Sequence, residues 1–83
     1  SLGLKAALVA DGSADLFVKD VVVRDWDMAP AAVLLAETGC VLERVGGGAY
    51  RFDGPIEKLD GVIAARESAL AEAARAMLAA PSA

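Results

Sequence analysis

The 83-residue sequence contains no histidine and only one cysteine, Cys40. One cysteine cannot form a disulfide within the chain, and a Cys/His zinc site cannot be built without histidine. Nucleophilic catalysis that depends on a histidine base is excluded as well, and neither Ser13 nor Cys40 has another candidate base close to it in the sequence. A single thiol is typical of a reducing compartment, so we expect the protein to be cytoplasmic.

Basic residues are also scarce, and they are scattered along the chain. There are 8 Lys and Arg residues against 12 Asp and Glu residues, which gives a formal net charge of -4 and a pI near 4.5. Because binding to nucleic acid depends on clustered Lys and Arg, we expect no nucleic-acid partner. The longest apolar run, residues 28–36, is about half as long as a membrane-spanning helix requires, so we expect no membrane partner either.

Apolar residues, in contrast, are abundant: they make up 57% of the chain, and the mean hydropathy is +0.49. A unit of 83 residues forms only a marginally stable core on its own. We therefore expect polypeptide outside these residues to cover part of the apolar surface, and we interpret the chain as the C-terminal part of a longer protein. A homodimer is an alternative way to cover such a surface.

The most informative stretch is Asp-Trp-Asp-Met-Ala-Pro at 25–30, which is followed by an apolar run and by Gly39. Proline is tolerated in the first turn of a helix, where N–H groups have no partner, and glycine suits the position just after its end. The pattern predicts a helix from Trp26 to Thr38, with Trp26 packed in the core. Asp27 then lies at the N–H-rich end of this helix, where it either acts as a cap or first-turn acid or binds a cation.

Helices and strands alternate along the rest of the chain. Apolar spacing predicts a helix over residues 1–10 and a closing helix over 68–78, capped by Ser68. One face of the closing helix is expected to carry Leu70, Ala74, Met77 and Leu78. Alternating or β-branched runs predict strands, at 14–18, 21–23, 40–45, 50–52 and 61–65. Residues 21–23 either extend the first strand or form a separate one, and the whole pattern predicts a single unit of the α/β class.

Two patterns that are typical of ligand sites lack essential residues. The Asp-x-Ser-x-Asp sequence at 11–15 has the first three ligand spacings of a calcium-binding loop. However, Leu16 stands where that loop needs glycine, and Val22 where it needs a glutamate that binds with both oxygens. The glycines at 46–48 do not form a phosphate loop, since neither a Lys-Ser/Thr pair nor a helix follows them. We expect a turn at each place.

Four segments resemble, in the same order and spacing, the C-terminal part of the inositol monophosphatase family, which belongs to a superfamily of metal-dependent and often lithium-sensitive phosphatases. They are Ser-Leu-Gly-Leu-Lys at 1–5, Val-Ala-Asp-Gly-Ser-Ala-Asp-Leu-Phe at 9–17, Trp-Asp-Met-Ala at 26–29, and Ala-Glu-Thr-Gly-Cys-Val at 36–41. Two residues depart from the family pattern. Cys40 replaces the second glycine of the usual Glu-Ala-Gly-Gly, and Pro30 stands where many members have alanine or glycine.

The resemblance implies a layered α/β fold, a mixed sheet with flanking helices, and magnesium-assisted hydrolysis of a small phosphate monoester. It matches Asp27 to a metal-ligating aspartate of the family, and Mg²⁺ prefers hard oxygen ligands at a site open to water. Such an ion activates the attacking water and neutralises charge on the leaving group. The family's other metal ligands lie in a glutamate-bearing segment and an Asp-Pro-(Ile or Leu)-Asp-Gly-Thr motif outside these residues. We therefore predict that these residues alone are inactive.

The resemblance also implies residues that contact the substrate. Ser1 and Leu2 match a helix start at which family members contact the alcohol part of the substrate; the alternative is an ordinary helix N-terminus. Lys19 and Asp20 match a position where inositol-type members place an acid that binds sugar hydroxyls. Because the loop that follows is slightly longer here, either residue can occupy that position. Asp20 would favour a polyol, whereas Lys19 would favour a second phosphate, as in 3′(2′),5′-bisphosphate nucleotidases.

Two classes of function remain. In the first, the chain is the C-terminal half of a magnesium-dependent phosphatase, and its other half is in the same polypeptide or in a separate chain. In the second, the chain is a structural piece that packs against a partner and does no chemistry. The residues do not identify the ester, because family relatives act on inositol phosphate, bisphosphate nucleotides, histidinol phosphate or fructose bisphosphate.

Overall fold

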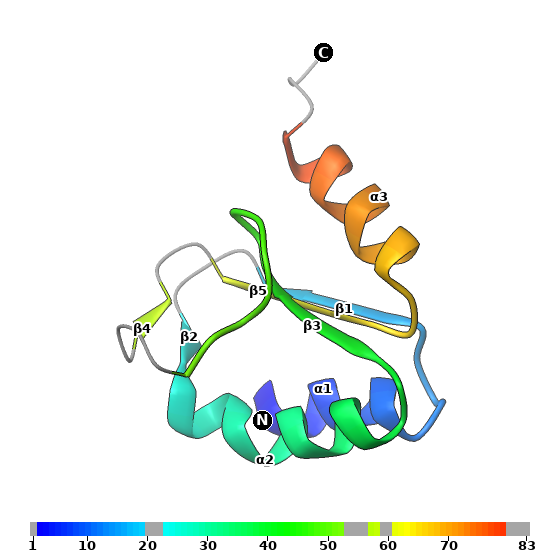
Figure 1. Cartoon of the computed structure of the whole chain (residues 1–83), viewed down its shortest axis with the longest axis vertical. Coiled ribbons are helices and arrows are strands. Elements are labelled where there is room, and N and C mark those ends of the chain that lie inside the picture. Colours follow the sequence, from blue (N-terminus) through cyan, green and yellow to red (C-terminus); the bar gives the residue numbers. More distant parts are fainter. Residues whose placement is uncertain (1, 20–22, 53–56, 59–60, 80–83) are drawn as a thin grey trace.

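Helices and strands alternate in the computed structural model of the chain, which describes residues 2–19, 23–52, 57–58 and 61–79 (Figure 1). The elements are α1 (Leu2–Ala10), β1 (Leu16–Lys19), β2 (Val23–Arg24), α2 (Asp25–Glu37), β3 (Val41–Arg44), β4 (Glu57–Lys58), β5 (Val62–Ala65) and α3 (Ser68–Ala79). The predicted α/β class is confirmed, and a helix occurs at each place where the sequence predicts one. Among the described helices, none is long and apolar enough to cross a membrane.

The main sheet has three strands in the order β1-β5-β3, and β5 is antiparallel to both of its neighbours. In the middle of the sheet, Ala64 stands opposite Phe17 of β1 and Leu42 of β3. A second sheet consists of β2 and β4, with Arg24 opposite Glu57. Every ladder between described strands is thus antiparallel, where the resemblance led us to expect a mixed sheet. β1 and β3 run in the same direction, but β5 separates them.

The main sheet lies between two layers of helix (Figure 1). Val62 and Ala64 of β5 belong to a core shared with α1 and α2, whereas Ile63 and Ala65 pack on the other face against α3. All of these side chains are fully buried, because successive residues of a strand point to opposite faces and both faces are covered at β5. A continuous apolar run is the sequence pattern expected of such a strand.

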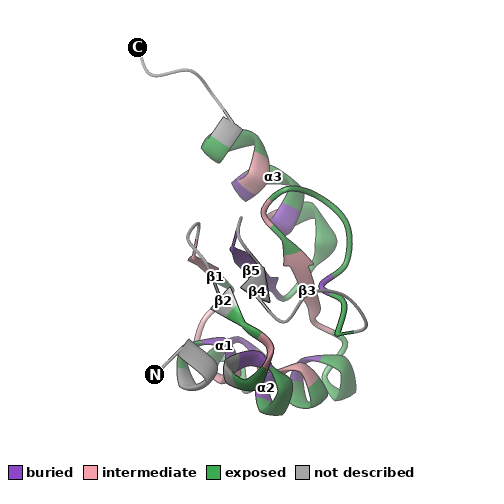
Figure 2. Cartoon of the chain, turned by 90° about the vertical axis from the view of Figure 1, so that its left-hand side faces the viewer, coloured by how far each residue is buried: buried purple, intermediate pink, exposed green. Residues whose placement is uncertain are grey.

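The larger core lies between α1, α2 and the sheet (Figure 2). Met28, Ala31 and Leu35 recur at helical spacing on α2 and are buried against Ala6 and Val9 of α1. Removing Met28 and Leu35 from water contributes about 2 kcal/mol for each side chain. This packing fixes the position of α2, which carries the candidate site.

Helix α2 begins at Asp25, one residue earlier than the sequence predicts. Its N-cap is Arg24, an extended residue (φ -119°, ψ 147°) whose side chain makes no capping hydrogen bond. Pro30 therefore lies in the second turn and not in the first, and without an N–H it gives the carbonyl of Trp26 no helical hydrogen bond. The predicted end of the helix is confirmed, since the C-cap is followed by Gly39 with a left-handed φ of +75°.

Residues 50–52 do not form the predicted strand. After the glycine turn, Ala49 bridges Glu43 of β3, and the N–H of Tyr50 donates to the carbonyl of Leu42 (3.0 Å). Within the described residues, no strand pairs with 50–52. An aromatic run predicts a strand because aromatic side chains pack well on a sheet. Here the side chain of Tyr50 does pack in the core with Val62 and Ala64 of β5, but the backbone of 50–52 is not a strand of either described sheet.

Three further details differ from or refine the prediction. β4 was not expected, because Glu and Lys are uncommon in strands. Val23 belongs to the separate strand β2, while residues 21–22 lie outside the described residues. Ser68 is the first helical residue of α3 and not its cap, because the carbonyl of Glu67 accepts a helical hydrogen bond from the N–H of Ala71 (3.4 Å).

Candidate functional site at the start of helix α2

The candidate site is the first turn of α2, which carries Asp27. β2 leads directly into this turn, and its pairing with β4 places Arg24 opposite Glu57. Immediately after β2, the carboxylate oxygen Oδ1 of Asp25 accepts a hydrogen bond of 2.8 Å from the hydroxyl of Tyr50. Both β4 and Tyr50, which come after β3 in the sequence, therefore contact the start of α2.

Asp27 is the third residue of α2, so its backbone lies in the first turn of the helix. Because Arg24 occupies the cap position, Asp27 is not the N-cap; it is a first-turn acid. The first N–H groups of α2 have no helical partner and give this end of the helix a partial positive charge. A carboxylate or another anion is therefore favoured here. The side chain of Asp27 lies outside the described residues.

Trp26 is exposed, which corrects the expectation that it packs in the core. Its exposed fraction is 64%, and the guanidinium carbon of Arg24 lies 5.8 Å from the centroid of its ring. Helix positions two residues apart point in nearly opposite directions, and Met28 points into the core. The tryptophan therefore points outward, and the outer side of the first turn is open to solvent.

Two of the other predicted site residues, Leu2 and Lys19, lie in described elements. Figure 1 shows that α1 and α2 both begin, and β1 ends, on the side that carries β2 and β4. Lys19 is the last residue of β1, stands opposite Val62 and is partly exposed. Leu2 is the first residue of α1, but its side chain is not among the described ones. Ser1 and Asp20 lie outside the described residues altogether.

The carboxylate of Asp27 in the first turn fits one part of a magnesium site but does not complete one. Mg²⁺ takes oxygen ligands, keeps several waters and is usually held by one or two carboxylates together with its substrate. In the part of the chain that the structure describes, no three Asp, Glu, Cys or His side chains come together as metal ligands. A magnesium ion at Asp27 therefore needs further ligands beyond the described groups.

The Asp-x-Ser-x-Asp stretch at 11–15 forms a turn, as expected. Oδ1 of Asp11 accepts the backbone N–H of Ser13 at 2.8 Å. Hydrogen bonds from the Ser13 hydroxyl and, secondly, from its backbone N–H lower the pKa of the Asp11 carboxyl. Asp15 faces Arg66, with 3.7 Å between Oδ1 and Nε. The acidic side chains of this turn are thus engaged with the protein itself.

Tyr50 is the residue of this site that the sequence patterns did not reveal. It is separated from Asp25 by 25 positions, so no local spacing connects the two residues. One signal was available. The chain has a single tyrosine, and a buried tyrosine hydroxyl usually finds a hydrogen-bond partner.

Comparison with known proteins relates nearly the whole chain to one family. The family model described as "Inositol monophosphatase family" matches residues 1–81. A curated relative, the 3'(2'),5'-bisphosphate nucleotidase CysQ of Aggregatibacter actinomycetemcomitans, is 43% identical over 42 residues. That match covers 51% of this chain and 16% of the CysQ protein. No solved structure matches this chain.

Proposed function

Because this chain belongs to the inositol monophosphatase family, we propose that it contributes to a cytoplasmic, metal-dependent phosphatase that hydrolyses a small phosphate monoester. The observation that carries the proposal is the Trp-Asp-Met-Ala sequence at 26–29, which lies in the first turn of α2 within the matched range. The open outer side of this turn, next to the exposed Trp26, gives a metal ion and an ester room to approach.

In this proposal Asp27 is a ligand of a magnesium ion. When bound, such an ion lowers the pKa of a water molecule and neutralises charge on the ester phosphate. The chain itself contributes a carboxylate on a helix that is fixed by the core. It also contributes the N–H groups of the first turn that have no partner within the helix, and their partial positive charge favours an anionic substrate.

The proposed contacts with the alcohol part of the substrate come from Ser1, Leu2, Lys19 and Asp20. An inositol or sugar phosphate is the first candidate substrate, with Asp20 bound to its hydroxyls. A 3′(2′),5′-bisphosphate nucleotide is the second candidate, and the similarity to a relative named for that activity favours it. Lys19 supports the second candidate, because its ammonium group at the end of β1 can pair with a further phosphate.

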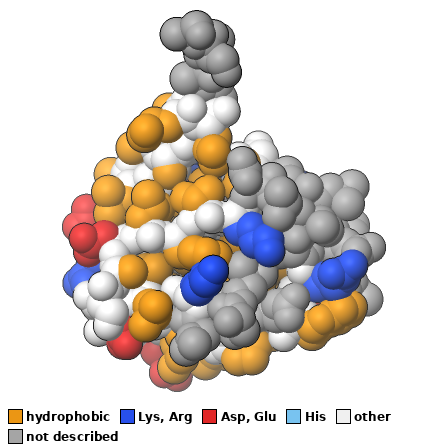
Figure 3. Space-filling model, turned by 180° about the vertical axis from the view of Figure 1, so that it is seen from behind, with side chains coloured by type: hydrophobic (Ala, Val, Ile, Leu, Met, Phe, Trp, Pro, Cys, Tyr) orange, Lys and Arg blue, Asp and Glu red, His pale blue; other side chains and the backbone are white. Residues whose placement is uncertain are grey.

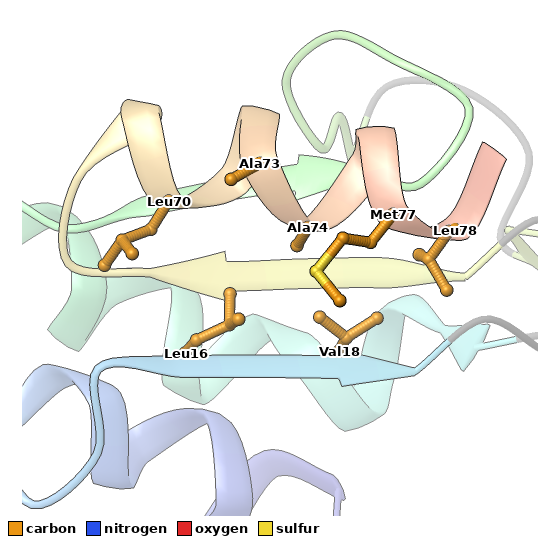
Figure 4. Close-up of a pocket in the computed structure, with 7 residues that line it drawn as sticks. All are labelled: Leu16, Val18, Leu70, Ala73, Ala74, Met77 and Leu78. Carbon is orange, nitrogen blue, oxygen red and sulfur yellow. The ribbon is translucent and has the colours of Figure 1, made fainter. Parts of the chain in front are cut away.

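The partner that this proposal requires is the remaining part of the phosphatase, in the same polypeptide or in a separate chain. Most of the CysQ relative lies outside its match to this chain, which covers 16% of that protein. An apolar groove of about 380 Å³ between α3 and β1 is a surface on which this partner could pack (Figure 4). The groove is lined by Leu16, Val18, Leu70, Ala73, Ala74, Met77 and Leu78.

The two edges of the main sheet also support a partner on the β1 side. The outer edge of β3 is bridged by Ala49, whereas no described strand pairs with the outer edge of β1. Next to that edge Met77 is 79% exposed, and Figure 3 shows hydrophobic side chains gathered over this part of the surface. Exposed apolar surface beside an unpaired strand edge is a typical site of association. A second copy of the chain is the alternative occupant.

The proposal is tested by measuring phosphate release from a panel of esters by the complete protein, with and without Mg²⁺. We expect Mg²⁺-dependent release, and loss of that release in the Asp27→Asn variant. The free energy of unfolding should change by less than about 1 kcal/mol, because the interaction of a first-turn acid with the helix end contributes no more than that. Asp15→Asn is the matched control, since its carboxylate faces Arg66 outside the site, and it should stay active.

Full activity of the Asp27→Asn variant would remove Asp27 from the mechanism. No release from any ester would favour the second class of function, a structural piece without chemistry. Lys19→Ala and Asp20→Ala separate the two candidate substrates, because the first should impair only bisphosphate nucleotides and the second only polyol phosphates. Light scattering then distinguishes the two occupants of the groove. A monomeric complete protein would mean that other residues of the same polypeptide cover the groove, and a dimer would favour a second copy.

A further inference from the structure

We propose that Tyr50 and Asp25 are positioning residues that hold the first turn of α2, and with it Asp27, in place for metal binding. This inference rests on the proposed function, because it takes Asp27 in the first turn of α2 to be a metal ligand. Its physical basis is the hydrogen bond of 2.8 Å between the Tyr50 hydroxyl and Oδ1 of Asp25.

The bond joins two groups that are both constrained. Tyr50 is 7% exposed and belongs to the larger core, and a buried phenolic hydroxyl without a partner is costly. Its partner Asp25 is the first residue of α2. A hydrogen bond to a carboxylate is shorter and stronger than one between neutral groups. The contact is therefore a firm connection between the core and the first residue of the helix.

Tyr50 is itself anchored to the main sheet. Its backbone N–H donates to the carbonyl of Leu42 in β3 at 3.0 Å, and the preceding residue, Ala49, bridges Glu43. Its ring packs against that of Phe52, with centroids 5.0 Å apart and planes tilted by 51°. The side chain of Tyr50 therefore links β3 of the main sheet to the first residue of α2.

The connection to Tyr50 matters because the start of α2 lacks two hydrogen bonds that many helices have. The side chain of the N-cap Arg24 makes no capping hydrogen bond to the N–H groups of the first turn. Pro30 removes the bond that an N–H at this position would give to the carbonyl of Trp26. Among the contacts of the described residues, the pairing of β2 with β4 before the turn and the hydrogen bond from the Tyr50 hydroxyl to its first residue hold the turn from outside.

Metal ligands depend on such support. Outer groups that orient a ligand typically change metal affinity by about tenfold or more when they are removed. Asp27 lies two residues after Asp25 in the same turn, so a shift of that turn moves the backbone of the ligand directly. Tyr50 and Asp25 touch neither the metal nor the ester in this proposal; they act through the position of the helix.

The test compares Tyr50→Phe, Asp25→Ala and Asp25→Asn in the complete phosphatase. Two measurements are made on each variant: Mg²⁺ affinity by titration calorimetry, and amide hydrogen exchange in the first turn of α2. Tyr50→Phe and Asp25→Ala should each weaken Mg²⁺ binding about tenfold and speed exchange in that turn. Asp25→Asn keeps an oxygen that accepts the Tyr50 hydroxyl, so it should restore both properties to near wild-type values.

The double variant Tyr50→Phe with Asp25→Ala should be no worse than Asp25→Ala alone, because Asp25→Ala already removes the acceptor of the Tyr50 hydroxyl. Asp15→Ala is the control, since it removes an exposed carboxylate outside this turn and should change neither measurement. Unchanged exchange and unchanged Mg²⁺ affinity in Tyr50→Phe would overturn the inference, as would an Asp25→Asn variant as impaired as Asp25→Ala. If Asp27→Asn binds Mg²⁺ normally, the proposed function fails. The hydrogen-exchange measurement would still test by itself whether the bond from Tyr50 to Asp25 holds the first turn of α2.

Discussion

The two faces of the main sheet are closed to different extents, although the same strands form both. On the face covered by α1 and α2, Met28, Leu35 and Val9 are fully buried in one continuous core. On the face covered by α3, the buried cluster consists of Ile63, Ala65 and Ala71, and apolar groove residues remain exposed beside it.

The difference follows from the width of the layers. A helix is about 10 Å across, and strands lie about 4.8 Å apart, so two helices side by side cover a three-stranded sheet but one helix does not. α3 covers β5 and leaves the β1 side open (Figure 4). The closed face fixes the start of α2, which is the candidate site, whereas the open face is where further polypeptide is expected to pack.

The largest expected effect on stability lies in the closed core. Leu35→Ala should lower the free energy of unfolding by about 3 kcal/mol, because it leaves a cavity among buried side chains. Leu34→Ala is the matched control, since Leu34 is the neighbouring residue but is exposed, and it should cost under about 1 kcal/mol. Urea unfolding measures both. Equal losses would contradict the assignment of the closed face.

Arg75 joins α3 to the end of β3, and it should give the next largest effect. Its guanidinium donates to Oε1 of Glu43 (2.7 Å) and to the carbonyls of Arg44 (2.8 Å) and Val45 (3.2 Å). Arg75→Ala should lower the free energy of unfolding by about 2 kcal/mol, since three hydrogen bonds are lost together and those to Glu43 and Val45 are partly buried. Glu43→Gln keeps an acceptor oxygen and should cost less. If Arg75→Ala unfolds at the wild-type urea concentration, these bonds do not hold α3.

Met77 tests the open face. In the 83-residue chain, Met77→Ala should change the free energy of unfolding by less than about 0.5 kcal/mol, because this side chain is 79% exposed. In the complete protein, where we expect the groove to be covered, the same substitution should cost about 2 kcal/mol. Urea unfolding of both forms measures the difference. A cost that is equally small in both would show that nothing packs on Met77.

The smallest effect concerns the turn between α1 and β1, which belongs to neither face. The pKa of Asp11 lies below its ordinary value because of the Ser13 hydroxyl and then the Ser13 backbone N–H. A lowered pKa in the folded state means that the carboxylate stabilises the fold above its unfolded pKa, and that this contribution is lost as the pH falls through the folded pKa. Ser13→Ala should raise the Asp11 pKa partway, which an NMR carboxyl titration would detect. Ser68→Ala should leave it unchanged.

Much of the fold could be predicted because its signals are local. Apolar spacing on α3 predicted the shared face of Leu70, Ala74, Met77 and Leu78, and these side chains do line one groove. Gly39 marked the end of α2, since a left-handed residue there favours glycine. The apolar run in β5 predicted a strand, and burial on both faces explains its lack of alternation.

What could not be predicted depends on contacts between distant parts of the chain. The pairing of β4 with β2 could not be predicted, because the Glu and Lys residues of β4 do not favour strands. The bond from Tyr50 to Asp25 spans 25 positions, so no periodicity contains it. The exposure of Trp26 follows from which face of α2 meets α1, and that face is set by Met28 and its neighbours and not by the hydrophobicity of Trp26.

The central claim is that the first turn of α2 carries a metal ligand, Asp27. The most direct measurement is anomalous diffraction from crystals of the complete protein grown with Mn²⁺ in place of Mg²⁺. The account predicts an ion about 2.1 Å from a carboxylate oxygen of Asp27, a distance typical of such hard cations, with the rest of its ligands from outside this chain segment. An ion bound elsewhere, with the Asp27 carboxylate turned away from it, would contradict the account.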